Sequence, residues 1–527
     1  MASEEGIRLR AIRTKVADTD ATTAGRDAYD GEIGQEMEPV TPAGRMFMQP
    51  NLSCCIVCII GFKNGINVAA MKKGLEETIV QHKRFSSVMK QDENGSKYWV
   101  RTKVNIDDHI VVPPASAINP ESSNKIEDYA AELALALPFD QSRPLWELHI
   151  LNVKSADAAA SAIFRIHHSL GDGISIMSLF LASTRSVSNP ISLPSVQPLS
   201  TEGLNSNERR AGSMYYYFSL FRWTCITIWC TLVEVGKFLL LLLGVKDSQT
   251  PLKGSIGVGR LAKSISTANI GLDDMRIVKN AVGGTVNDVF LGIVSSGIRR
   301  YLQQHADKLA IHSSNNQGNH PVYGGTKEAV AARISIQDKC IDVLRIRATS
   351  LVNTRTQPGL PELSTMMQGG SQARWGNSIG YVLTPLCMKK HDDPLDYVRK
   401  AKETIDRKKC SLEAIFTYWS AQLILKLVGA EAAVNMSYNA LVHTTLALSN
   451  MIGPLEEAMF FGNPITDIVP TVFGQPQALC IHLQSYMGKA KLVVTVAKDI
   501  IPDPDILLQH IVYSLEDMKQ AACARTH

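Results

Sequence analysis

The chain has 527 residues, of which 45% are apolar and 20% are charged, a balance typical of folded globular proteins rather than disordered ones. This length exceeds what one hydrophobic core usually organises, so we expect at least two folded units. The 54 basic and 50 acidic residues leave a net charge of +4, which is too small and too dispersed to indicate a nucleic-acid-binding protein.

The N-terminus, residues 1–40, is polar with scattered charge and lacks the apolar core of a secretory signal. We therefore expect a disordered tail and a protein that faces the reducing cytosol. The ten cysteines agree with this expectation, because no pair at metal-ligand spacing is answered by a second pair or by histidines. They predict buried, reduced thiols and no metal site.

Residues 41–183 form the first expected folded half. Short apolar runs bounded by turn residues predict buried strands, and longer segments with apolar residues at helical spacing predict helices. The alternation of the two indicates an α/β unit. The expected strands are 52–62 and 160–166, and the expected helices are 68–82, 125–137 and 173–182.

Residues 184–265 are interpreted as a linker that contains an apolar segment, 213–245. Glu234 and Lys237 interrupt this segment, and each charge would cost about 2.5–3.5 kcal/mol at the centre of a bilayer. Their i, i+3 spacing allows them to pair on one face. The alternatives are a membrane span, an amphipathic helical hairpin in the membrane interface, and a soluble helix buried against a domain. The pentaleucine run Leu239–Leu243 favours a membrane-associated segment, because it leaves no polar face there.

Residues 266–527 form the second expected half. A helix is predicted over 285–304, where apolar residues share one side, and a strand is predicted over 343–352. Two further strand-like runs, 479–486 and 492–498, flank the turn Met487-Gly488-Lys489 and predict a hairpin.

The segment that indicates chemistry is His167-His168-Ser169-Leu170-Gly171-Asp172-Gly173. It places two histidines at the end of a predicted strand, on a turn, before a predicted helix. A histidine exposed on such a turn has an ordinary pKa near 6.5, so it is mostly neutral in the cytosol and can accept a proton. The alternative is structural: Asp172 can be the N-cap of the following helix. Two adjacent histidines with Asp-Gly at a fixed spacing favour the catalytic interpretation.

At these residues the sequence resembles the CoA-dependent acyltransferases, whose motif is HHxxxDG. Within that superfamily, an ordered set of further segments resembles the plant-type wax ester synthase/diacylglycerol acyltransferase family, from about residue 40 to about residue 520. These segments are Pro144-Leu145-Trp146-Glu147, Thr285-Val286-Asn287-Asp288-Val289, Val352-Asn353-Thr354-Arg355, Gly376-Asn377-Ser378-Ile379-Gly380 and Ser449-Asn450-Met451-Ile452-Gly453-Pro454.

The resemblance implies an α/β fold of two pseudo-symmetric sandwich halves, similar to chloramphenicol acetyltransferase, with a tunnel between them. It makes His168 the catalytic base, supported by His167 and Gly173, and it makes Asp172 a brace for the loop. It also implies that Asn287 and Asp288 face the histidine from the other half. Here an alternative stays open, because Asp288 with Thr285 also resembles a capping box, while Asn287 lies where helix N–H groups can stabilise an oxyanion.

Structural roles are assigned to five further residues of these segments, because packing and turn geometry explain them. These residues are Pro144, Trp146, Asn353, Arg355 and Asn450.

The same resemblance implies transfer of a long-chain acyl group from acyl-CoA, a substrate, to a fatty alcohol or to diacylglycerol, without cofactor or metal. The alternatives are an acyltransferase for another alcohol and a lipid-binding or scaffold protein of the same fold with little turnover. We expect membrane lipid as a partner and a location on the cytosolic face of the endoplasmic reticulum, or else of the plasma membrane. Since both halves must join on one side, segment 213–245 is expected to lie flat or to form a hairpin broken near Glu234–Lys237.

Overall fold

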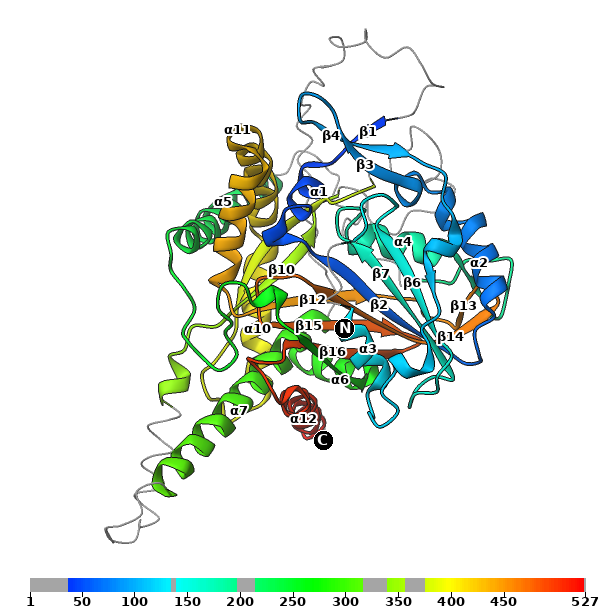
Figure 1. The fold of residues 1–527 in the computed structure, drawn as a ribbon. Coiled ribbons are helices and arrows are strands. Elements are labelled where there is room, and N and C mark those ends of the chain that lie inside the picture. The colour runs from blue at the N-terminus through cyan, green and yellow to red at the C-terminus, as the bar shows by residue number, and fades with distance from the viewer. Residues whose placement is uncertain (1–36, 134–138, 197–213, 316–338, 356–374, 526–527) are drawn as a thin grey trace.

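The computed structural model describes residues 37–133, 139–196, 214–315, 339–355 and 375–525. Two large mixed sheets lie at the centre of this part of the molecule, with helices packed around them (Figure 1). The α/β class predicted from the sequence is confirmed.

The first sheet carries the candidate histidines at the end of one central strand. β2 (Cys55–Phe62) pairs antiparallel with β7 (Ala160–His167) on one side, where Cys55 lies opposite His167. On its other side β2 pairs antiparallel with β14 (Asn463–Phe473), where Cys55 lies opposite Phe473. β2 and β7 are almost wholly buried, as expected for an apolar run inside a sheet. The strand order is β5 (Ile110–Val111), β6 (Trp146–Leu151), β7 (Ala160–His167), β2 (Cys55–Phe62), β14 (Asn463–Phe473), β13 (Ala458–Phe460) and β8 (Thr184–Ser186).

The second sheet is formed by the C-terminal half. Its strand order is β11 (Ile379–Pro385), β10 (Arg347–Asn353), β12 (Leu446–Ile452), β15 (Leu479–Tyr486), β16 (Lys489–Ala497) and β9 (Lys263–Gly271). β10, β12 and β15 run parallel to one another, and the remaining pairs are antiparallel. The predicted hairpin is confirmed: β15 and β16 are joined at Met487 and Gly488, which both have positive φ angles.

The helices divide between two hydrophobic cores. One core packs α2, α3 and α4 with the first sheet and also takes in Ile265 and Val493 from the second. The other packs α6, α7, α10 and α12 against the second sheet. The helices are α1 (Pro42–Phe47), α2 (Val68–Glu77), α3 (Lys125–Glu132), α4 (Gly173–Ala182), α5 (Met214–Leu242), α6 (Leu272–Val282), α7 (Val286–Asn315), α10 (Leu395–Lys409), α11 (Glu413–Val442) and α12 (Pro504–Cys523).

The two halves are joined by exchange of strands as well as by packing. β13 and β14 come from the C-terminal half of the chain, yet they complete the first sheet by pairing with β8 and β2. The first part of the expected linker therefore belongs to this sheet as its edge strand β8. The two halves therefore cannot lie on opposite sides of a membrane while the first sheet is intact.

Two further expectations, the extent of the N-terminal tail and the burial of the cysteines, need partial correction. The expected tail, residues 1–40, lies mostly outside the described residues, but β1 (Met37–Pro39) pairs with β4 (Lys97–Arg101), which also pairs with β3 (Ser87–Gln91). Glu38 on β1 holds the buried Arg84 through two hydrogen bonds, and this explains why the strand extends into polar sequence. The cysteines are all free, as expected, but Cys225, Cys340 and Cys523 are exposed rather than buried.

The apolar segment forms one continuous helix, α5, so the expected hairpin with a break near Glu234–Lys237 is wrong. The helix continues through these charges because Glu234 is neutralised where it stands. Its carboxylate is fully buried and accepts hydrogen bonds from Lys237 (2.9 Å), Arg407 (2.7 Å) and Lys408. The expected i, i+3 pair is thus confirmed, but Glu234 turns toward α10 and not toward solvent.

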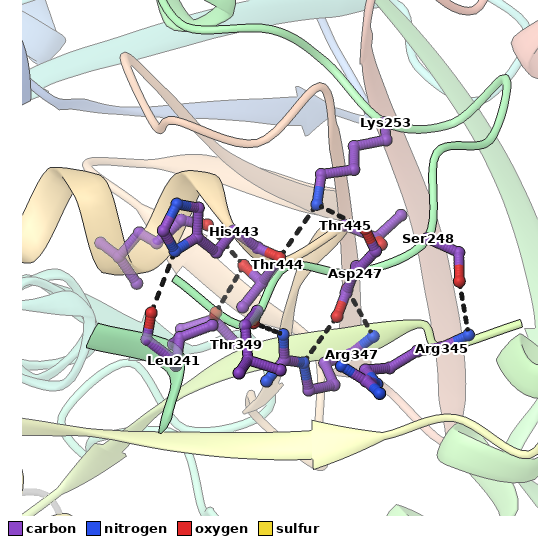
Figure 2. A network of polar contacts seen from close by, with 12 residues as sticks. Leu241, Asp247, Ser248, Lys253, Arg345, Arg347, Thr349, His443, Thr444 and Thr445 are labelled. Carbon is purple, nitrogen blue, oxygen red and sulfur yellow. Dashed lines mark hydrogen bonds and ion pairs between the residues drawn. The ribbon is translucent and has the colours of Figure 1, made fainter. Parts of the chain in front are cut away.

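The chain leaving α5 is fastened to the second sheet by a buried polar network (Figure 2). Asp247 accepts hydrogen bonds from the side chain (2.5 Å) and the backbone N–H (2.8 Å) of Arg347 on β10, and from the hydroxyl of Thr445 (2.7 Å). His443 lies within hydrogen-bonding distance of the carbonyl of Leu241 in the last turn of α5. The C-terminal end of α5 is therefore fixed relative to the second sheet.

Candidate functional site

The turn between β7 and α4 places His168 inside the molecule. β7 ends at His167, and the backbone N–H of His168 donates to the carbonyl of Cys54 (2.9 Å), which extends the β2–β7 pairing by one step. The His168 residue is only 3% exposed. The expectation of a histidine exposed on a turn is therefore wrong, because residues of the second half cover the turn.

Asn377 is the residue that orients His168. Its side-chain nitrogen donates to the backbone carbonyl of His168 (2.9 Å), which leaves its oxygen facing Nδ1 of the imidazole at 3.1 Å. An amide oxygen can only accept, so Nδ1 carries the proton and Nε2 keeps its lone pair. This tautomer is the one that a general base needs.

Burial sets the charge state of the His168 ring. The ring stacks on Phe47 of α1, with centroids 4.3 Å apart. Removal from water lowers the pKa of His168, and the nearby charge of Asp172 and the hydrogen bond to Asn377 oppose this shift in part. The net direction is downward, so the imidazole is neutral at cytosolic pH.

Asp172 braces the turn and does not point its oxygens at the histidine. One oxygen caps α4 by accepting from the N–H of Ser175 (2.9 Å). The other accepts from Arg355 (2.7 Å) and from the N–H of Ser378 (3.0 Å). The N-cap interpretation is therefore correct, and the carboxylate also joins the two halves. Gly173 is the first residue of α4 and lines the cavity described below.

His167 lies on the other side of the strand end. Its Nδ1 is 2.7 Å from the hydroxyl of Ser169, and Nε2 is 3.4 Å from that of Ser53. Burial, together with the neighbouring His168 and Arg165, lowers the pKa of His167 to about 3. His167 is not among the described residues of the cavity wall, and its ring contacts Ser169 of the turn and Ser53.

The two residues expected from the other half have different positions. Asn287, in the first turn of α7, lines the same cavity as His168 and accepts a hydrogen bond from Asn450 (2.6 Å). Asp288 is fully buried and accepts from the backbone N–H (2.6 Å) and the hydroxyl (2.9 Å) of Thr285. The capping-box interpretation is thus correct for Asp288, and only Asn287 reaches the cavity.

A cavity of about 790 Å³ lies between the halves with His168 and Asn287 in its wall. Its lining combines strands of both sheets with α1, α4 and the first turn of α7. Most of the wall is apolar, including Phe47, Ile56, Leu351 and Met451. Such a space suits a lipid whose reacting polar group is brought to His168.

Sequence reasoning missed Asn377 and Phe47 as site residues. Asn377 had been noted only as part of a segment typical of a family, and it lies 209 positions from its partner. Phe47 stands in a short helix with no distinguishing pattern. A buried histidine needs a hydrogen-bond partner for its second nitrogen. This requirement predicts that an amide or carboxylate lies beside the ring, but it does not say which residue of the chain supplies it.

Comparison with known proteins agrees with this arrangement. A family model described as "Wax ester synthase/diacylglycerol acyltransferase catalytic domain" matches residues 67–290, and one described as "WS/DGAT C-terminal domain" matches residues 375–519. The chain is 36% identical to wax ester synthase/diacylglycerol acyltransferase 5 of Arabidopsis thaliana, with 99% of each chain covered. It is 38% identical to member 4 of the same plant, covering 95% of this chain and 93% of the relative.

Solved structures show the same fold at low sequence identity. A wax ester synthase/diacylglycerol acyltransferase from Marinobacter aquaeolei VT8 aligns with a TM-score of 0.54 at 15% identity, over 92% of this chain and all of that one. A trichothecene 15-O-acetyltransferase from Fusarium sporotrichioides aligns with a TM-score of 0.50 at 13% identity, over 92% and 96%. The two-halved acyltransferase fold expected from the sequence is therefore confirmed.

Proposed function

The chain belongs to the wax ester synthase/diacylglycerol acyltransferase family, and we propose on that premise that it transfers a long-chain acyl group from acyl-CoA to the hydroxyl of a fatty alcohol or a diacylglycerol. The observation that carries the proposal is the contact of 3.1 Å between Nδ1 of His168 and the amide oxygen of Asn377. With Nδ1 committed to Asn377, the lone pair of Nε2 is available in an apolar cavity between the halves.

The proposed reaction is a single transfer without an acyl-enzyme. Nε2 of His168 takes the proton of the acceptor hydroxyl as its oxygen attacks the thioester carbonyl, so a C–O bond forms. The C–S bond then breaks, and the imidazolium returns the proton to the departing CoA sulfur. Asn377 holds the ring throughout, and the apolar wall excludes the water that would otherwise hydrolyse the thioester.

Asn287 is proposed to stabilise the oxyanion that develops during this attack. It lines the cavity at the N-terminal end of α7, where helix N–H groups favour negative charge. Its side-chain nitrogen is not used by Asn450, which donates to the oxygen of Asn287. That leaves an N–H donor for the substrate.

The proposed activity can be tested directly. Purified protein is incubated with labelled palmitoyl-CoA and either hexadecanol or dioleoylglycerol, and the lipid products are separated. Formation of a labelled ester with at least one acceptor supports the function. An active family member is assayed alongside as a positive control. If the protein binds both lipids but forms no ester while the control is active, the result supports the alternative of a lipid-binding protein.

We also propose that the enzyme works on the cytosolic face of the endoplasmic reticulum membrane, with α5 lying in the membrane surface. Of the described residues, one unbroken helix, Tyr217–Leu242, is long and apolar enough to cross a bilayer, with mean hydropathy 1.9 and only 11% of its best window buried. Its exposed side chains include Phe218, Phe221, Trp229, Leu232 and Leu240.

α11 extends the same apolar surface. It lies beside α5 (Figure 1), and the hydroxyl of Thr231 on α5 accepts from the N–H of Leu412 at the start of α11. The exposed apolar side chains of α11 include Trp419, Leu423, Leu427 and Val428. A surface made of two neighbouring helices resembles an interfacial anchor more than a lone span.

Three features support a helix lying in the interface over a spanning one. Glu234 fixes the middle of α5 to Arg407 and Lys408 of α10. Asp247 fixes the chain just beyond it to β10. The first sheet contains strands of both halves, which supports a topology with both halves on one side of the membrane.

Fractionation and protease protection test this location. Deleting residues 213–245 is expected to release a tagged protein from microsomes, and replacing Leu423 and Leu427 of α11 by aspartate is expected to weaken attachment. Aspartate at Val343, an exposed apolar residue outside α5 and α11, is the control. Protection of a C-terminal tag while an N-terminal tag is digested would rule out the proposed topology.

A further inference from the structure

A second histidine, His482 on β15, faces the same cavity as His168. The neighbouring Ile481 and Leu483 point into the core beneath α7 and α12, so alternation along the strand directs His482 to the opposite face, between the sheets. The residue is 6% exposed and belongs to the cavity wall. Ser449 of β12 is its register partner and also lines the cavity.

The hydrogen bonding of His482 is incomplete. Among the described residues, its Nε2 has no hydrogen-bond partner. The large majority of buried side-chain polar atoms in proteins have a hydrogen-bond partner, and an unsatisfied one costs roughly 1–3 kcal/mol. Because His482 belongs to the wall of a cavity, a ligand that enters this cavity can supply the missing partner.

The surroundings restrict what that partner can be. Among the described residues of the cavity wall, Asp172 is the one permanently charged side chain, and Arg355 neutralises it. Burial lowers the pKa of His482 to about 4, so the ring is neutral at cytosolic pH. The same cavity wall contains neutral hydroxyl and amide groups, from Thr349, Thr471 and Gln477. A neutral carbonyl or hydroxyl fits this site, whereas a phosphate or an ammonium group does not.

The two candidate acceptors differ in this respect. A fatty alcohol has one polar group, its reacting hydroxyl, and the proposed reaction brings that group to His168. A diacylglycerol has two ester carbonyls in addition to its hydroxyl. The pantetheine arm of CoA also carries carbonyls, but it is common to reactions with either acceptor.

We propose that His482 is a specificity-determining residue, whose imidazole N–H donates a hydrogen bond to an ester carbonyl of an acylglycerol acceptor. This inference rests on the proposed acyltransferase function and goes beyond it by naming the contact that favours an ester-bearing acceptor over a plain alcohol. The hydrogen bond is made in the acceptor complex and leaves the chemistry at His168 unchanged.

The first test removes the carbonyls from the substrate and leaves the protein intact. Wild-type enzyme is assayed with palmitoyl-CoA and either dioleoylglycerol or the matching dialkylglycerol, in which ethers replace both esters. The diester is expected to have a kcat/KM about three- to tenfold higher, the effect of one neutral hydrogen bond. The same ratio is then measured for His482→Leu, where it is expected to fall to about one.

Three controls make the result specific. His482→Gln keeps an N–H donor and is expected to retain part of the preference for the diester. His391→Leu, a partly buried histidine outside the cavity wall, is expected to keep the wild-type ratio. His482→Leu is expected to lose more activity with dioleoylglycerol than with hexadecanol, since the alcohol makes no contact of this kind.

Several outcomes overturn the proposal. Equal use of diester and diether by the wild type would mean that no carbonyl is recognised. Equal loss with glyceride and hexadecanol in His482→Leu, with a raised KM for acyl-CoA, would assign the residue to the pantetheine arm instead. Robust hexadecanol activity without glyceride activity overturns this inference alone, whereas a wild type inactive with both acceptors overturns the proposed function as well.

Discussion

The side chain of Asn377 contacts both ends of His168. Its oxygen lies 3.1 Å from Nδ1 of the ring, and its nitrogen donates to the backbone carbonyl of the same residue at 2.9 Å. His168 directly follows β7 of the first sheet, whereas Asn377 lies just before β11 of the second. The orientation of the proposed base therefore depends on the assembly of the two halves.

Replacing Asn377 tests whether this contact selects the tautomer. Asn377→Ala is expected to lower kcat about three- to tenfold, the effect of one neutral hydrogen bond. Asn377→Asp is expected to raise the pKa of His168, because a carboxylate beside Nδ1 stabilises the imidazolium. The acid limb of the pH–rate profile for Asn377→Asp should therefore lie above that of the wild type. An unmoved limb would show that Asn377 acts on packing alone.

Removing the proposed base is the most direct test of the mechanism. His168→Ala is expected to reduce turnover of palmitoyl-CoA and hexadecanol by about 10²–10⁴, the usual contribution of a general base. The fold should persist, because the cavity formed by the truncation opens into an existing one. Circular dichroism serves as the control, and a purified variant with more than half of the wild-type rate would exclude His168 as the base.

Asp172 and Arg355 are expected to act as one unit. Asp172→Asn keeps an oxygen to cap α4 but leaves Arg355 without its carboxylate, and breaking a buried ion pair typically costs about 3–5 kcal/mol. Arg355→Ala should destabilise by a similar amount, and the double variant by much less than the sum. Urea unfolding of the four proteins measures this coupling. Normal stability with no activity in Asp172→Asn would instead assign the carboxylate a direct chemical role.

The sequence predicted the elements that depend on local pattern. Periodicity located α4 and β15 with both ends correct, because apolar spacing and turn residues mark them in the chain itself. Motif recognition located His168 and its turn. Pattern also allowed two roles for Asp288, and the structure selected the cap because Thr285 supplies both of its donors.

Contacts between distant segments could not be predicted in this way. Nothing in the local pattern of β14 indicates that it crosses into the first sheet, since either sheet could bury its apolar run. The continuity of α5 was missed for a related reason. The charges of Glu234 and Lys237 suggested a break, whereas Arg407 and Lys408, more than 170 positions away, make Glu234 acceptable inside a continuous helix.

That buried cluster gives a prediction about stability. Glu234→Gln leaves Arg407 without its carboxylate and Lys408 with Glu413 alone, so unfolding should require less urea, with a loss of about 3 kcal/mol or more. Lys237→Ala is the matched control on the same helix. Lys237 is 43% exposed, and exposed pairs contribute about 0–1 kcal/mol. Equal effects of the two changes would mean that the cluster does not anchor α5.

The burial of His168 predicts an unusual pH dependence. The active form of a general base is the deprotonated one, and burial lowers the pKa of His168 below its ordinary value of about 6.5. The kcat/KM measured with hexadecanol should therefore stay level as the pH falls through 6.5 and should decline only at lower pH.

The free energy of unfolding also depends on pH in the acid range, because the buried histidines bind protons more readily in the unfolded chain than in the folded protein. His167, whose pKa is lowered to about 3, contributes to this effect. Stability is thus complete above the unfolded pKa and decreases as the pH falls below it. Circular dichroism at each pH separates loss of fold from protonation of the base, and an acid limb centred at 6.5 or above in folded protein would contradict a buried, neutral His168.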